Sequence, residues 1–340
     1  MHLKSFGAFA TVFRDIEEIF SDIIDTSADQ NLKRKIASGA KSLAELEKII
    51  EFFVNEGRDR YLLRSPEEEI LRQPNPRGYQ FFGKPIFLIG NRRSGTTLLA
   101  YLINASPNIC AIPENFLVGG LVSADSVINL GQRVATFLRE PISTFLSRLG
   151  EMANSIYSRY AAEQAKARWV SKELFVPHKL DLVDALFNYQ AQFVYVVRHG
   201  FSVAYSCSSR FSTNPFTQNA STSLDLECYL NEWISNNEST MDFHERNSDR
   251  CTLIRYEDLL ADPEAEGCRI FRFLGEAWEV DILEKMNSEM IIGMGDNKIL
   301  ERGGKIGVLE ETWRTWPNAL KRTLGRKANA MLTRLGYDPV

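Results

Sequence analysis

A glycine-framed loop with two adjacent arginines is the part of this sequence best suited to chemistry. Residues 90–97 read Gly-Asn-Arg-Arg-Ser-Gly-Thr-Thr and follow a short hydrophobic run. Glycines permit a tight turn, and backbone N–H groups at the start of the next helix can converge on an anion. Nucleotide triphosphatases place a Lys directly after the second glycine, where this chain has Thr96. Arg92 and Arg93 offer bidentate hydrogen bonds instead, so the loop predicts an oxyanion site rather than an ordinary turn.

A second candidate anion site lies about a hundred residues further along the chain. The hydrophobic run at 192–197 ends directly before Arg198, and Ser206 follows eight residues later within a helical pattern. An Arg at the carboxyl end of a strand and a hydroxyl two turns into the next helix can converge on one phosphate. The alternative for Arg198 is a salt bridge at the end of the strand.

A third glycine-rich and basic segment lies near the C-terminus. Residues 302–307 read Arg-Gly-Gly-Lys-Ile-Gly, and Trp313 follows. Glycines let the backbone approach a ligand closely, while Arg302 and Lys305 bring positive charge. A surface loop without a ligand is the alternative for this segment.

The elements that must position these residues form an alternating pattern of strands and helices. Residues 85–90, 192–197 and 250–256 are short hydrophobic runs, and the first two lead directly into helical patterns. This order predicts an α/β fold, a three-layer sandwich with a central, mostly parallel sheet. Residues 8–60 carry two helical patterns, and two prolines and a glycine at 72–78 separate them from the rest. We therefore expect a helical N-terminal extension over 1–78 and a catalytic domain over 79–340.

Composition limits the partners and the compartment. The 340 residues include 40 basic and 44 acidic side chains, a net charge of −4, so no global positive field predicts nucleic-acid binding. Any anion must therefore be bound locally. No stretch is long and apolar enough to span a membrane. The five cysteines lack metal-site spacing, which favours reduced thiols, a cytoplasmic protein and no metal site.

The motifs together resemble those of sulfotransferases that use 3′-phosphoadenosine 5′-phosphosulfate (PAPS). Residues 93–98, Arg-Ser-Gly-Thr-Thr-Leu, are similar to the loop that holds the 5′-phosphosulfate in that family without an obligatory metal. Arg198 and Ser206 match its 3′-phosphate motif, although residues 199–202 depart from the usual pattern. The resemblance covers 85 to about 320, and 302–307 match more loosely. It implies that PAPS is bound by Arg92, Arg93, Ser94, Gly95, Thr96, Thr97, Arg198, Ser206, Tyr256, Arg302, Gly304 and Lys305.

The same resemblance implies the residues that act on the reacting atoms. Glu114 follows the first helix at a spacing similar to that of the catalytic Glu in tyrosylprotein sulfotransferases and related bacterial enzymes. Lys172 lies in a segment similar to the strand in which that subfamily places a catalytic Lys. Glu114 would serve as general base, Lys172 would stabilise charge on the leaving phosphate, and Arg93 would bring positive charge to the sulfate-bearing end of PAPS. A solvated Glu and a surface Lys are the alternatives, and a role for His178 or His244 beside the base stays open.

The expected function is transfer of a sulfuryl group from PAPS to a hydroxyl or amine, which leaves 3′-phosphoadenosine 5′-phosphate (PAP). The alternatives are a P-loop nucleotide kinase or triphosphatase and a non-catalytic nucleotide-binding partner module. No G-x-G-x-x-G segment supports a nicotinamide enzyme. The acceptor is open among small molecules, glycans, lipids and peptides, and segments 115–168 and 211–249 should surround it. The N-terminal helices are expected to pack on the main domain or to form a homodimer.

Overall fold

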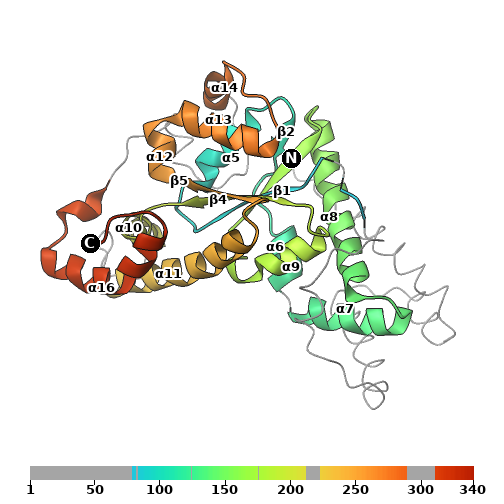
Figure 1. Ribbon diagram of the computed structural model, residues 1–340, viewed down its shortest axis with the longest axis horizontal. Helices are drawn as coiled ribbons and strands as arrows, with labels where there is room; N and C mark the ends of the chain where they lie inside the picture. Colours follow the sequence, from blue (N-terminus) through green and yellow to red (C-terminus); the bar gives the residue numbers. More distant parts are fainter. Residues whose placement is uncertain (1–78, 82, 124, 175, 212–222, 289–310) are drawn as a thin grey trace, which may run out of the picture.

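The computed structural model describes residues 79–340 except 82, 124, 175, 212–222 and 289–310 (Figure 1). The expected helical extension over 1–78 lies outside the described residues, as does the segment that contains Arg302, Gly304 and Lys305. The boundary at residue 78, the homodimer and the roles of these three residues therefore stay predictions.

A five-stranded sheet forms the centre of the fold. Its order is β2-β3-β1-β4-β5, and every neighbouring pair is parallel. This confirms the predicted α/β fold with its parallel sheet. The sheet also includes β2, a strand of only three residues that the sequence analysis did not predict. The strands are β1 (Ile86–Gly90), β2 (Ile109–Ala111), β3 (Arg168–Glu173), β4 (Gln192–Val197) and β5 (Cys251–Arg255).

Helices cover both faces of the sheet, as Figure 1 shows. The upper layer in that view contains α5 (Thr96–Asn104), α12 (Tyr256–Ala261), α13 (Pro263–Leu274) and α14 (Ile282–Ser288). The lower layer contains α6 (Leu117–Ser123), α9 (Leu180–Leu186), α10 (Gly200–Phe211), α11 (Ser223–Arg246) and α16 (Asn318–Arg334). The long helix α8 (Ile142–Glu163) packs on β2, β3 and α9, and α7 (Asp125–Leu138) packs on α8. Two short 3₁₀ turns occur at Pro177–Lys179 and Thr312–Thr315.

The core consists of two apolar clusters, one on each face of the sheet. Alternate residues of β1 serve the two clusters, with Phe87 in one and Leu88 in the other, and both are fully buried. Phe87 packs against the rings of Trp169, Phe187 and Phe193 at centroid distances of 4.9 to 5.6 Å. Burial on both faces explains why β1 and β4 are continuous apolar runs rather than alternating ones.

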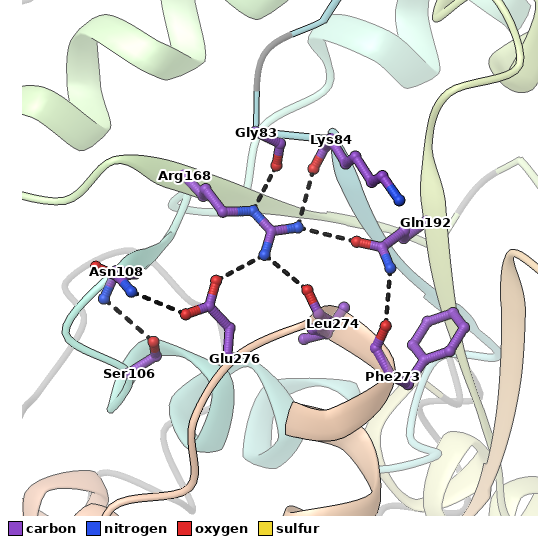
Figure 2. Close-up of polar contacts among 9 residues, drawn as sticks. All are labelled: Gly83, Lys84, Ser106, Asn108, Arg168, Gln192, Phe273, Leu274 and Glu276. Carbon is purple, nitrogen blue, oxygen red and sulfur yellow. Dashed lines mark hydrogen bonds and ion pairs between the residues drawn. The ribbon is translucent and has the colours of Figure 1, made fainter.

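Arg168 ties together the amino ends of the strands, at the edge opposite the glycine loop (Figure 2). Its guanidinium donates to Gln192 Oε1 at 2.9 Å, to the Leu274 carbonyl at 2.8 Å and to Glu276 Oε1 at 2.6 Å. It also donates to the backbone carbonyls of Gly83 and Lys84. The side chains of Arg168 and Glu276 are only 13% and 7% exposed. The pair therefore joins β1, β3, β4 and the end of α13 within a largely dry environment.

Two further observations concern the membrane and the thiols. Within the described ranges, we find no helix whose length and apolar character would let it cross a bilayer. All five cysteines are free thiols: Cys110, Cys207 and Cys251 are buried, Cys268 is partly exposed and Cys228 is exposed.

Candidate active site

The predicted site residues come together at the carboxyl edge of the sheet. The glycine loop follows β1, Glu114 follows β2, Lys172 lies near the end of β3, Arg198 follows β4 and Tyr256 follows β5. Because all five strands are parallel, their carboxyl ends meet at one edge, which is where open α/β sheets bind ligands. Segments far apart in the sequence therefore contribute to one location.

The loop between β1 and α5 adopts a conformation that requires glycine at one position. Gly95 has a φ of 96°, and a Cβ there would lie 2.2 Å from Cδ2 of Tyr256. Arg93 also has a positive φ, 67°, which is uncommon for a residue with a side chain. The loop closes on itself through a hydrogen bond from the Ser94 amide to the Asn91 carbonyl at 3.2 Å. The ring of Tyr256 thus packs directly on the loop.

Two polar groups in this region are suited to bind an anion. Among the residues with described positions, no side chain caps the N-terminus of α5, so its first amides are suited to bind an anion. The Ser94 hydroxyl is fully buried and has no hydrogen-bond partner among the described residues. Buried hydroxyls are normally hydrogen-bonded, so this one is suited to donate a hydrogen bond to a bound anion. Thr96 and Thr97, also buried, begin the helix beside it.

The two predicted phosphate motifs form one connected cluster. Arg93 Nε donates to Ser206 Oγ at 3.0 Å, and Arg198 Nη1 donates to the Arg93 carbonyl at 3.1 Å. The Arg198 guanidinium lies 4.8 Å from the centroid of the Tyr256 ring. Its Nε is buried and has no hydrogen-bond partner within the described part of the chain. The site therefore has two arginines, a hydroxyl and an aromatic ring within contact of one another.

Glu114 and Lys172 meet beside the start of α5. Lys172 Nζ lies 3.5 Å from Glu114 Oε1 and donates to Thr97 Oγ1 at 3.3 Å. The Lys172 side chain is 3% exposed and that of Glu114 is 28% exposed. Low exposure strengthens the interaction between the two charges, and it leaves the carboxylate as the more accessible partner. The structure thus brings the predicted base into contact with the predicted cation, and the cation in turn contacts the loop helix.

Arg92 lies in the loop, but its guanidinium faces α11, a helix within the segment that was expected beside the acceptor and not at the phosphate motifs. It forms a bidentate pair with Glu232 of α11, with both distances from Nη2 at 2.7 Å. One turn further on, Asn236 donates to Asn91 Oδ1 at 2.9 Å. Trp233 donates to the Arg198 carbonyl at 3.1 Å. Helix α11 therefore supports both phosphate motifs, and no local sequence pattern identified these contacts in advance.

The histidines differ in their surroundings. His199 stacks on Trp313 with the ring centroids 4.4 Å apart, and burial lowers its pKa to about 4, with a smaller opposing effect from Glu311. It is therefore neutral at pH 7 and adds no positive charge beside Arg198. His178 contacts Ser239, and burial lowers the pKa of His244. Among the residues that the structure describes, no group of three or more His, Cys, Asp or Glu side chains is arranged to hold a metal ion.

Curated proteins with similar sequences include one from Sinorhizobium fredii and one from Drosophila melanogaster. Nodulation protein NoeE of Sinorhizobium fredii is 25% identical over 252 residues, which are 67% of this chain and 59% of that protein. The protein-tyrosine sulfotransferase of Drosophila melanogaster is 26% identical over 296 residues, 80% of this chain and 56% of that protein. This chain thus spans less than two thirds of either relative.

Solved structures show the same fold. The sulfotransferase domain of the olefin synthase from Synechococcus PCC 7002 aligns with a TM-score of 0.51 and 21% identity, over 79% of this chain and 97% of that one. The sulfotransferase domain of the curacin biosynthetic pathway aligns with a TM-score of 0.50 and 20% identity, over 76% of this chain and 99% of that one. The profile of the "Sulfotransferase family" matches residues 85–280, a range that includes β1 to β5 and most of the site described above. The chain belongs to the sulfotransferase family.

Proposed function

We propose that this protein transfers a sulfuryl group from PAPS to a hydroxyl or amine, with Glu114 as general base. The observation that carries the proposal is the contact of Lys172 with both Glu114 and Thr97, at 3.5 and 3.3 Å, directly beside the uncapped N-terminus of α5. This contact supports the proposal because a carboxylate and a buried cation lie beside the loop that we expect to bind the anion. Family membership supports the same reaction class.

The residues present fit PAPS. The first amides of α5 and the hydroxyl of Ser94, which lack side-chain partners in the described ranges, suit the 5′-phosphosulfate, with Arg93 beside them. Arg198, whose buried Nε lacks a partner in the described residues, suits the 3′-phosphate together with Ser206. The ring of Tyr256 lies against Arg198, and we expect it to contact the nucleoside. Arg302, Gly304 and Lys305 are expected to complete this half of the site.

Three side chains of this protein have separate roles in the proposed reaction. PAPS supplies an activated sulfuryl group, and its phosphate leaves as PAP. Glu114 accepts the proton of the acceptor, a role that contributes typically 10²–10⁴-fold in rate. Lys172 and Arg93 stabilise the negative charge of the leaving phosphate, and removal of one such donor costs roughly 10²–10³-fold. The burial of Lys172 keeps its charge poorly screened by water.

The role of Glu114 as general base can be tested by a single substitution. Glu114→Gln keeps the shape of the side chain but cannot accept a proton, so turnover should fall by about 10²-fold or more while PAP affinity stays within about twofold. Turnover is measured as incorporation of label from ³⁵S-labelled PAPS into a cell extract, and PAP affinity by calorimetry. Glu151→Gln, on the exposed face of α8, is the matched control. Near-wild-type turnover of Glu114→Gln would show that this carboxylate is not the base.

The alternatives give different results in the same experiments. A nucleotide kinase or triphosphatase would bind ATP with Mg²⁺ in preference to PAP without it. A non-catalytic nucleotide-binding module would bind PAP but label nothing in any extract. Identification of the labelled product names the acceptor, which is expected among small molecules, glycans, lipids and peptides.

A further inference from the structure

Asn115, the residue after the candidate base, fastens the chain on both sides of Glu114. Its Nδ2 donates to the Pro113 carbonyl at 3.0 Å, and its Oδ1 accepts from the Leu117 amide at 3.0 Å. The segment around Glu114 belongs to no regular helix or strand, since β2 ends at Ala111 and α6 begins at Leu117. The Asn115 side chain therefore replaces the backbone ladder that would otherwise hold this segment.

A tyrosine from a distant helix holds Asn115 in turn. The Tyr157 hydroxyl of α8 donates to Asn115 Oδ1 at 2.7 Å, across 42 positions of sequence. Tyr157 is 2% exposed, and its ring packs edge-on against Trp169 of β3 with centroids 4.8 Å apart. Burial raises the pKa of Tyr157 far above its usual value, so the hydroxyl keeps its proton and remains a donor. A rigid ring thus presents a fixed hydrogen to the Asn115 oxygen.

The hydrogen bonds of Asn115 affect the reaction because they set the position of the Glu114 carboxylate. The described contact of the Glu114 side chain is the 3.5 Å pair with Lys172, which is long for a charge-assisted hydrogen bond. That pair alone orients the carboxylate only loosely, so the backbone on either side must set its position. A misplacement of about 1 Å can cost on the order of 10²-fold in rate.

We propose that Tyr157 is a positioning residue for Glu114 and acts through the side chain of Asn115. This inference rests on the proposed function, because it requires Glu114 to be the base. Neither residue belongs to the phosphate motifs, and the sequence placed both only within the segments expected to surround the acceptor. A purely structural Tyr157 would support the fold without any specific effect on the step that Glu114 performs.

The central variant is Tyr157→Phe, which removes one hydroxyl and leaves the packing against Trp169. With ³⁵S-labelled PAPS and the extract fraction that the wild type labels, apparent kcat should fall about 10- to 100-fold. The apparent KM for PAPS and the PAP dissociation constant should change by less than about twofold, because the phosphate motifs are untouched. Tyr160→Phe makes the same chemical change three residues further along α8, and it should keep wild-type kinetics. Unchanged kcat in Tyr157→Phe, or an equal loss of PAP affinity, would overturn the proposal.

A double-mutant cycle separates positioning from structural support. In the Glu114→Gln background there is no base left to position, so Tyr157→Phe should lower the residual rate by less than about twofold. A full additional loss there would overturn the inference. Asn115→Ala removes the acceptor of the Tyr157 hydrogen bond and should reproduce the loss of kcat. This variant tests the positioning role if Tyr157→Phe folds poorly. Wild-type turnover of Glu114→Gln alone would contradict the proposed function instead.

Discussion

Gly95 and Arg93 show how individual backbone angles shape the candidate anion site. The positive φ of 67° at Arg93 turns the loop so that its carbonyl accepts from Arg198 and its side chain reaches Ser206. The φ of 96° at Gly95 lets the loop pass directly over the ring of Tyr256. The two phosphate motifs are therefore joined through backbone as well as side chains.

This geometry predicts the effect of adding one methyl group. Gly95→Ala would place Cβ 2.2 Å from Tyr256 Cδ2 at an unfavourable φ, so the loop or the ring must move. We expect a loss of about 1–3 kcal/mol in the free energy of unfolding and a large loss of PAP affinity. Chemical denaturation and calorimetry measure the two effects. Gly120→Ala in α6, where a Cβ meets nothing within 4 Å, should leave PAP affinity unchanged and cost no stability. Equal effects of the two substitutions would show that the loop does not depend on the close approach of Gly95 to Tyr256.

At the scale of elements, the sequence predicted the strands that are continuous apolar runs. It did not predict the very short strand or the contacts between segments far apart in the chain. β1 and β4 are buried on both faces, so their hydrophobic runs predicted them. β2 has three residues, too few for any pattern, and pairs only with β3 along one edge of the sheet. Helix α11 contacts the loop through Glu232, 140 positions from Arg92 in the sequence. Such long-range pairs arise from tertiary packing, which no local spacing encodes.

The hydrogen bonds of Arg168, at the opposite edge of the sheet, could not be predicted from local sequence either. Three of its five acceptors are backbone carbonyls, which any sequence supplies, so the residue types around it gave no signal. Its placement depends on the ends of β1, β4 and α13 meeting at one point (Figure 2). The cluster fixes the amino ends of the strands whose carboxyl ends form the site.

We therefore predict a large effect of Arg168→Met on stability and a small one on binding. Loss of the guanidinium leaves the Glu276 carboxylate, 7% exposed, without its cation, which should cost about 3–5 kcal/mol of unfolding free energy. PAP affinity of the folded fraction should be unchanged, because the site lies at the other edge of the sheet. Arg159→Met is the control, since its pair with Glu163 on α8 is 69% and 61% exposed and should be worth about 0–1 kcal/mol. Urea denaturation of both variants tests the contrast.

For the whole molecule, a net charge of −4 gives no general attraction for anions, so any anion must be bound by a local group of charges. The arginines at positions 93 and 198 lie in contact at the carboxyl edge of the sheet. Two other buried groups make stability depend on pH in opposite directions. Burial raises the pKa of Glu173 to about 7, despite hydrogen bonds from Ser171 and Gly119, and lowers that of His199 to about 4.

The signs of these two contributions follow from which state binds more protons. Between pH 4.5 and 7 the folded state holds a proton on Glu173 that the unfolded state has lost, so stability falls as pH rises through this range. Between pH 6.5 and 4 the unfolded state protonates the histidine that the folded state keeps neutral, so stability falls as pH drops. The two effects oppose each other below pH 6.5, and a single stability curve would conceal both.

The substitution Glu173→Gln separates the contribution of Glu173 to the pH dependence of stability from that of His199. The amide is neutral at every pH and can still exchange hydrogen bonds with Ser171 and the Gly119 amide, so the variant lacks only the cost of burying a charge. Its unfolding free energy minus that of the wild type should rise from pH 4.5 to about 7 by on the order of 3 kcal/mol and stay level above that. Urea denaturation at half-unit pH steps measures the difference, with the exposed Glu151→Gln as a flat reference. A difference that does not change with pH would mean that Glu173 is ionised in the folded protein at neutral pH, with its charge stabilised by a neighbouring group.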